Sequence, residues 1–172
     1  LVSMHFQETE AENNLFIKKK GSFFTWLNSI NASPSIWELR SRPHQILTEL
    51  GTKNLMLVHN TFARKEDIGD YYYCTCPKSN LFIENQVPDY SLFNPEKLCV
   101  GTDSLVSNDS LSILDELRVI KENSNFNLNT LFKIASKNGA EALGFSSLGT
   151  FEKGKKPGVN LVRNLDEVEI IS

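Results

Sequence analysis

The chain has 172 residues, of which 40% are hydrophobic and 23% charged, and its formal net charge is −3. This composition can fill a core and excludes a wholly disordered chain. The length excludes a complete eight-stranded α/β barrel, which needs roughly 200 residues. The basic runs at 18–20 and 153–156 are too short for the clustered positive charge of a nucleic-acid interface, so no nucleic-acid partner is expected.

The first part of the chain alternates between predicted strands and helices. Helix-forming residues stop at Gly21, and a later apolar run has Pro43 at its first turn. Between them lies an aromatic stretch without helical periodicity, which predicts a packed loop or lid. The predicted elements are a strand at 1–7, a helix at 8–20, the loop at 21–42, a helix at 43–50, a strand at 54–58 and a helix at 64–71.

The second part continues the alternation. Its clearest helix carries Ile113, Leu117 and Ile120 on one apolar stripe, with Asp109 or Ser110 as a predicted N-cap. The predicted elements are strands at 72–76 and 98–100, helices at 110–122 and 129–143, and a final strand at 159–162. Continuous apolar strands separated by helices indicate a parallel sheet. The four βα units suit either half of an eight-unit barrel or a small open α/β sheet.

Polar residues follow these strands where each one ends. His5 and Glu8 follow the first strand, His59 the second, Asn80 the third and Asp103 the fourth. Parallel α/β folds bind ligands at the carboxyl ends of their strands. Two imidazoles and two carboxylates there suit a divalent metal with acid/base partners. Singly, each residue also has a structural explanation, such as a helix cap for Asp103.

Several short motifs in this order resemble a known family. They are Met-His-Phe-Gln-Glu-Thr at 4–9, Val-His-Asn at 58–60, Cys-Pro-Lys-Ser-Asn-Leu at 76–81, Gly-Thr-Asp-Ser at 101–104 with Ser-Asn at 107–108, Ala-Ser-Lys-Asn-Gly-Ala-Glu-Ala-Leu-Gly at 135–144, and Gly-Thr-Phe-Glu-Lys-Gly-Lys-Lys at 149–156. Together they resemble the second half of the amidohydrolase superfamily, in its branch of cytosine-, guanine- and adenosyl-type deaminases and chlorohydrolases.

The resemblance implies strands five to eight of a metal-dependent (β/α)8 barrel in residues 1–148. Residues 149–172 would add a short strand to an accessory β-sandwich. One divalent metal is implied, zinc or alternatively iron. The resemblance implies that His5 and Asp103 bind the metal, and that Asp103 also accepts the proton of the attacking water. Glu8 would be the acid/base, and His59 would contact the activated water. Ser79 and Asn80 would line the substrate pocket.

The implied activity is hydrolysis of a C–N or C–X bond, chiefly deamination of a heterocyclic or nucleoside-like small molecule. The family's His-x-His pair does not occur in this sequence. We therefore expect the chain to be the C-terminal half of a longer enzyme and to be inactive without the missing N-terminal half. The alternative is a noncatalytic half-barrel module that binds a partner or forms a homodimer through its exposed sheet edge.

The cysteine content and hydropathy predict the compartment. Cys74, Cys76 and Cys99 are odd in number and have no disulfide-framework spacing, which suggests a reducing compartment. No apolar run reaches the ~18 residues of a membrane span, and no signal peptide is recognisable. These features favour a cytoplasmic protein without a membrane partner.

Overall fold

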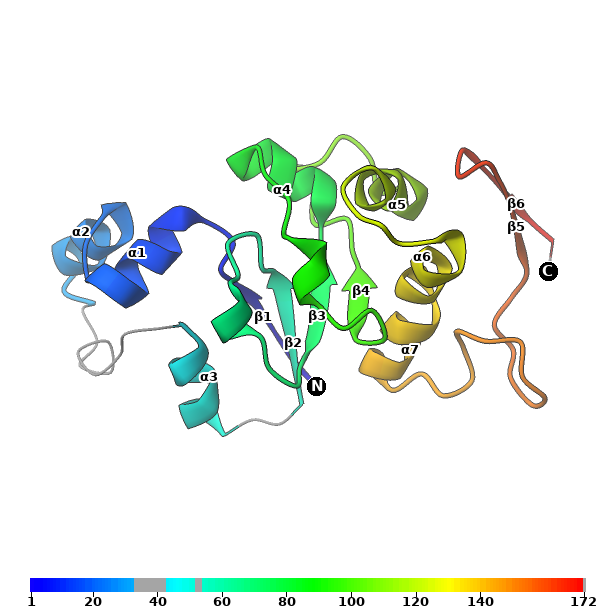
Figure 1. Cartoon of the computed structure of the whole chain (residues 1–172), viewed down its shortest axis with the longest axis horizontal. Coiled ribbons are helices and arrows are strands. Elements are labelled where there is room, and N and C mark those ends of the chain that lie inside the picture. Colours follow the sequence, from blue (N-terminus) through cyan, green and yellow to red (C-terminus); the bar gives the residue numbers. More distant parts are fainter. Residues whose placement is uncertain (33–42, 52–53, 172) are drawn as a thin grey trace.

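The computed structural model describes residues 1–32, 43–51 and 54–171. A parallel sheet lies at its centre, with helices around it (Figure 1). The strands are β1 (Val2–Phe6), β2 (Leu55–His59), β3 (Tyr72–Thr75), β4 (Leu98–Val100), β5 (Asn160–Arg163) and β6 (Glu167–Ile170). The helices are α1 (Glu10–Lys18), α2 (Ser22–Ser29), α3 (Pro43–Leu50), α4 (Pro77–Glu84), α5 (Ile113–Glu122), α6 (Leu128–Ala135) and α7 (Lys137–Leu143), with 3₁₀ turns η2 (Lys65–Asp67) and η3 (Tyr90–Leu92).

The main sheet has the strand order β1-β2-β3-β4, and every neighbouring pair is parallel. In this register Phe6 lies beside His59, and Thr75 lies beside Val100. The predicted parallel sheet is therefore confirmed. Because the register aligns the last residues of neighbouring strands, the loops that follow all four strands leave from one edge of the sheet.

One face of the sheet carries the main hydrophobic core. Leu57, Tyr73 and Leu98 lie side by side on this face, because each is a register partner of the next. They belong to one buried cluster with α5 and α6, whose fully buried members include Leu117, Ile120, Leu131 and Ile134. Among the described residues, the buried cluster on the opposite face is small and centres on Met56 and Cys99. Helix packing thus covers one face more thoroughly than the other.

Helix α5 confirms the predicted apolar stripe. Leu117 and Ile120 are buried as the periodicity requires. The helix begins later than predicted, because the side chain of Ser112 accepts a hydrogen bond from the backbone N–H of Asp115 and acts as the N-cap. Neither Asp109 nor Ser110 caps this helix.

Three predicted elements differ from the structure. Residues 22–29 form α2 rather than a loop, because a helix built from residues of low helix propensity carries little sequence signal. The rest of the predicted loop, 33–42, lies outside the described residues. The helix predicted at 64–71 is only the turn η2, where the buried side chain of Asp67 accepts a hydrogen bond from the Arg64 backbone.

The helix predicted at 129–143 is two helices, α6 and α7, separated at Ser136. The Ser136 hydroxyl donates to the carbonyl of Phe132 at 2.5 Å, and such a bond to the preceding turn bends helices. Helix α4 was not predicted, because Cys76-Pro77 resembles the end of a strand followed by a turn. In the structure Pro77 occupies the first turn of α4, where its missing N–H costs no hydrogen bond.

The predicted C-terminal strand belongs to a hairpin. Strand β5 pairs antiparallel with β6, which the sequence analysis missed. Leu165, in the turn between them, is buried in the main core, and Arg118 of α5 forms an ion pair with Asp166. The division into domains at residue 148 stays a prediction.

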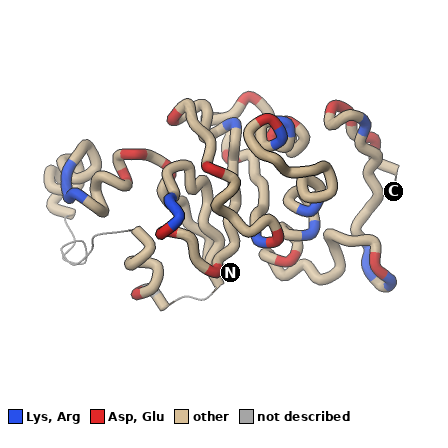
Figure 2. The backbone as a smooth tube through the Cα atoms, viewed as in Figure 1, with Lys and Arg blue, Asp and Glu red and all other residues tan. Residues whose placement is uncertain are grey.

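Basic and acidic residues are interspersed along the described backbone (Figure 2). The three cysteines are free thiols. Among the helices that the structure describes, none is both long and apolar enough to cross a membrane.

Candidate metal centre

Three potential metal ligands meet at the carboxyl edge of the sheet. His5 is the next-to-last residue of β1, His59 is the last residue of β2, and Asp103 follows β4. One ligand atom from each lies within 4.8 Å of the other two. Two imidazoles and a carboxylate form a donor set typical of zinc. The structure therefore brings together both predicted ligands and adds His59 as a third candidate.

The two histidines differ strongly in environment. The His5 side chain is 61% exposed, whereas the His59 side chain is completely buried. Their rings meet edge to face, with centroids 4.6 Å apart. The Nε2 atom of His59 is buried and has no hydrogen-bond partner among the described residues. A buried nitrogen without a hydrogen-bond partner, close to other possible metal-ligating atoms, fits a ligand to a metal ion.

Asn80 determines which nitrogen of His59 is available. Asn80 Oδ1 lies 2.8 Å from His59 Nδ1, and both side chains are buried. Because an amide oxygen can only accept, Nδ1 carries the proton and Nε2 keeps its lone pair. A metal-binding histidine is commonly oriented in this way by a hydrogen bond to its other nitrogen.

Glu8 connects the two imidazoles. Its Oε2 lies 3.5 Å from His5 Nδ1, and its Oε1 lies 3.5 Å from His59 Nε2. The backbone N–H of Glu8 donates to the side chain of Glu12, which also accepts from the N–H of Gln7. Burial raises the pKa of Glu12 more than these hydrogen bonds lower it. Glu12 thus holds the turn that presents Glu8 to the cluster.

Asp103 is held by two hydroxyl groups. Ser79 and Ser107 both donate to its Oδ2, at 2.8 and 2.7 Å. Burial raises the pKa of Asp103, but the hydrogen bonds from Ser107 and Ser79 outweigh this effect and lower the pKa overall. Asp103 is therefore ionised at neutral pH, as a metal ligand must be.

The predicted pocket residues Ser79 and Asn80 are both buried, against Asp103 and His59. Their substrate-binding role stays a prediction. Sequence reasoning gave no role to Ser107 or Glu12. Ser107 belongs to the Ser-Asn pair that follows the Gly-Thr-Asp-Ser motif, but the motif alone did not indicate its contact with Asp103. Glu12 could have been found from the spacing Thr9-x-x-Glu12, which is typical of a helix capping box.

The backbone at this edge adopts an uncommon conformation. His59 and Asp103 have φ values of 71° and 57°, in the left-handed region, as do Gln7 and Asn60. Residues other than glycine rarely adopt this region, at a cost of about 1–3 kcal/mol each, and they concentrate at functional sites. Strain gathered at the strand ends supports a functional role for this edge.

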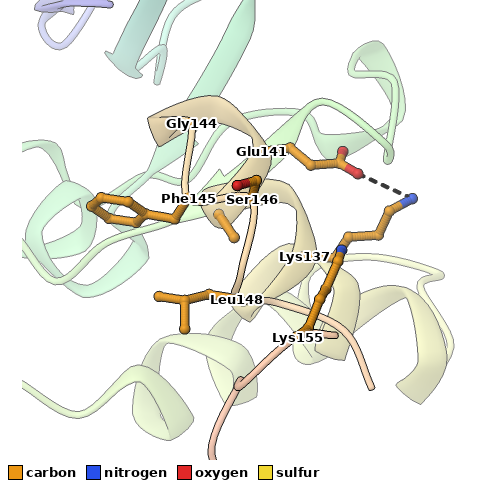
Figure 3. Close-up of a pocket in the computed structure, with 8 residues that line it drawn as sticks. Lys137, Glu141, Gly144, Phe145, Ser146, Leu148 and Lys155 are labelled. Carbon is orange, nitrogen blue, oxygen red and sulfur yellow. Dashed lines mark ion pairs between the residues drawn. The ribbon is translucent and has the colours of Figure 1, made fainter. Parts of the chain in front are cut away.

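A separate pocket lies at the end of α7 (Figure 3). Its lining residues are Lys137, Ala140, Glu141, Gly144, Phe145, Ser146, Leu148 and Lys155. Lys137 is paired with Glu141 at 3.7 Å, and Lys155 Nζ donates to Thr150 at 2.7 Å. None of His5, His59 and Asp103 lines this pocket, so it is distinct from the candidate metal centre.

The fold is similar to solved deaminases. An aminofutalosine deaminase of Helicobacter pylori, solved in complex with methylthio-coformycin, matches with a TM-score of 0.72 and 29% identity, over 92% of this chain and 42% of that one. An adenosine deaminase from Xanthomonas campestris with bound zinc matches with a TM-score of 0.66 at 22% identity, over 92% of this chain and 36% of that one, a likeness of fold alone.

Curated relatives agree with this likeness. An adenosine deaminase of Helicobacter pylori and an aminodeoxyfutalosine deaminase of a Nitratiruptor species are each 29% identical over 94% of this chain. The chain spans only 42% of the length of either relative. The family model of the amidohydrolase family matches residues 1–169. The chain therefore belongs to the amidohydrolase family.

Proposed function

We propose that the chain is part of a metal-dependent deaminase that hydrolyses the C–N bond between an amino group and a nitrogen heterocycle, most simply a nucleoside-like compound. The observation that carries this proposal is the convergence of His5, His59 and Asp103 within 4.8 Å. The names of the relatives, adenosine deaminase and aminodeoxyfutalosine deaminase, support the substrate class.

The four parallel strands would form strands five to eight of a (β/α)8 barrel, and the β5–β6 hairpin would join an accessory sheet. The 42% coverage of the relatives supports this arrangement, because the remainder of such a protein can supply the other four strands. The absent His-x-His pair would come from that remainder and complete the ligand set. Activity would then require both parts.

His5 and Asp103 would hold the metal, with His59 beside them, and zinc suits this donor set. When bound, a divalent metal would lower the pKa of water towards ~7 and make hydroxide available at neutral pH. The lowered pKa of Asp103 keeps its carboxylate ionised at neutral pH, so it would be in the form that can accept a proton from the water. The hydrogen bond between His59 Nδ1 and Asn80 would keep His59 Nε2 directed at the reacting oxygen.

Glu8 would carry the second proton transfer. Its carboxylate lies 3.5 Å from both imidazoles and is partly open to solvent. Glu8 would take one proton of the attacking water and pass it to a substrate ring nitrogen as the hydroxide adds to the carbon that bears the amino group. The remaining water proton, taken up by Asp103, would pass to the amino group, which leaves as ammonia. Positioned acid/base groups of this kind accelerate such reactions by about 10²–10⁴-fold.

Zinc binding tests the metal centre without a substrate. We expect the purified chain to bind Zn²⁺, and Asp103→Ala to lose this binding, as measured by isothermal titration and by metal content after dialysis. The control is Asp70→Ala, which removes an exposed carboxylate that pairs with Lys97. Equal zinc binding by Asp103→Ala and the control would contradict the metal centre.

Ammonia release tests the reaction. A polypeptide that joins this chain to the remainder of the barrel should release ammonia from adenosine or 5′-methylthioadenosine, and Asp103→Ala should abolish the release. The chain alone should be inactive. Turnover by the chain alone would contradict the proposed need for a second part.

A further inference from the structure

Glu116 is a buried carboxylate outside the candidate metal centre. It lies in α5, and none of its side chain is exposed. Its Oε2 accepts from the backbone N–H of Lys78 at 2.9 Å, and its Oε1 accepts from Asn108 Nδ2 at 2.6 Å. A buried carboxylate is costly unless donors compensate it, so these two bonds explain why the group is tolerated.

The first bond holds the beginning of α4. Lys78 is the second residue of this helix, and its N–H is one of the first four, which have no partner inside a helix. The two residues that follow Lys78 are Ser79 and Asn80. Their side chains contact Asp103 and His59 respectively. A shift of this helix end would therefore move both contacts.

The second bond holds the loop that carries Asp103. Asn108 Nδ2 also donates to the carbonyl of Thr102 at 2.7 Å, so one amide group bridges the start of the loop and Glu116. Ser107, which donates to Asp103, directly precedes Asn108. The loop includes the left-handed backbone of Asp103, a conformation that persists only when its surroundings hold it.

We propose that Glu116 is a positioning residue that fixes α4 and the 102–108 loop against each other, and so sets the spacing between the His59–Asn80 pair and Asp103. The inference rests on the proposed function of the cluster and deepens it. A carboxylate is required because two donors converge on it. A glutamine would accept one hydrogen bond and present its own N–H₂ to the other donor.

The test is Glu116→Gln in the whole purified chain, compared with Leu117→Ala. Leu117 is the buried neighbour in α5 and belongs to the core cluster. The readouts are the NMR resonances of the Asn80 side-chain amide and of the His59 ring. We expect both to shift in Glu116→Gln and to keep their wild-type positions in Leu117→Ala at temperatures where both variants are folded. Wild-type resonances in Glu116→Gln, or equal shifts in both variants, would overturn the proposal.

A second variant separates the two bonds. Asn108→Ala removes the bond to the loop and leaves that to Lys78, so it should shift the Asp103 carboxyl resonance while the Asn80 amide stays in place. A shift of the Asn80 amide alone would overturn the proposal. Zinc affinity should fall by ~10-fold in Glu116→Gln, as for other residues that support ligands. The NMR readouts need no metal, so failure of the metal centre and failure of this proposal give different results.

Discussion

His59 Nδ1 and Asn80 Oδ1 lie 2.8 Å apart in the interior, and this contact determines the tautomer of the most buried candidate ligand. The histidine ends β2 and the asparagine belongs to the first turn of α4. The availability of His59 Nε2 for a metal or a reacting oxygen therefore depends on where α4 begins.

Asn80→Ala tests this dependence. Without the acceptor, the His59 ring can change tautomer or rotate, so zinc affinity of the chain should fall by ~10–100-fold. Isothermal titration with Zn²⁺ measures the change. Asn129→Ala, at an exposed position of α6, is the control and should bind zinc as the wild type does. Equal affinities of the two variants would show that Asn80 does not support the site.

Ser107→Ala tests the pKa of Asp103. The pKa of this carboxyl lies below its ordinary value of 3.8 in the folded chain. The ionised Asp103 carboxylate therefore adds to the stability of the fold above pH 3.8, the ordinary pKa of the group. This contribution is lost as the pH falls through the lower pKa of the folded state. Removing the Ser107 hydroxyl should raise the folded-state pKa and shift this loss to higher pH.

The measurement is a ¹³C NMR titration of the Asp103 carboxyl, with Ser29→Ala as the control because Ser29 is exposed at the end of α2. A midpoint in Ser107→Ala equal to or below that of the control would contradict the role given to Ser107.

Glu8→Gln separates proton transfer from metal binding. A glutamine keeps the shape of the side chain but cannot donate and accept a proton in turn. In the complete enzyme, kcat should fall by ~10²–10⁴-fold. Zinc content should stay near that of the wild type. Glu10→Gln, at the exposed start of α1, should leave both unchanged. Loss of zinc in Glu8→Gln would instead make Glu8 a ligand.

Leu117→Ala tests the core that supports the sheet. Leu117 is 1% exposed and packs from α5 into the main hydrophobic core on the sheet, so its truncation leaves a cavity. The free energy of unfolding should fall by about 2–5 kcal/mol. Urea denaturation measures it, with the 61%-exposed Leu111 truncated to Ala as the control. A loss no larger than that of the control would mean that this cluster does not stabilise the fold.

Local patterns were enough to predict much of the fold. The continuous apolar run at 54–58 predicted a buried strand, and the spacing of Ile113, Leu117 and Ile120 predicted an amphipathic helix. Both follow from the periodicity of the backbone, which a sequence displays directly. Helix α4 and strand β6 were missed because their signals are weak and their stability comes from contacts with other segments.

The sequence by itself determined which residues stand at the strand ends, because an apolar run shows where a strand stops and which polar residues follow. It predicted His5, Glu8, His59 and Asp103 as one set on that basis. Only the tertiary structure decided how these residues meet. Strand order and register bring His59 within ligand distance of His5 and Asp103, and α4 and α5 supply Asn80 and Glu116 to hold them. Such distances depend on packing between segments far apart in the chain, and no local pattern encodes them.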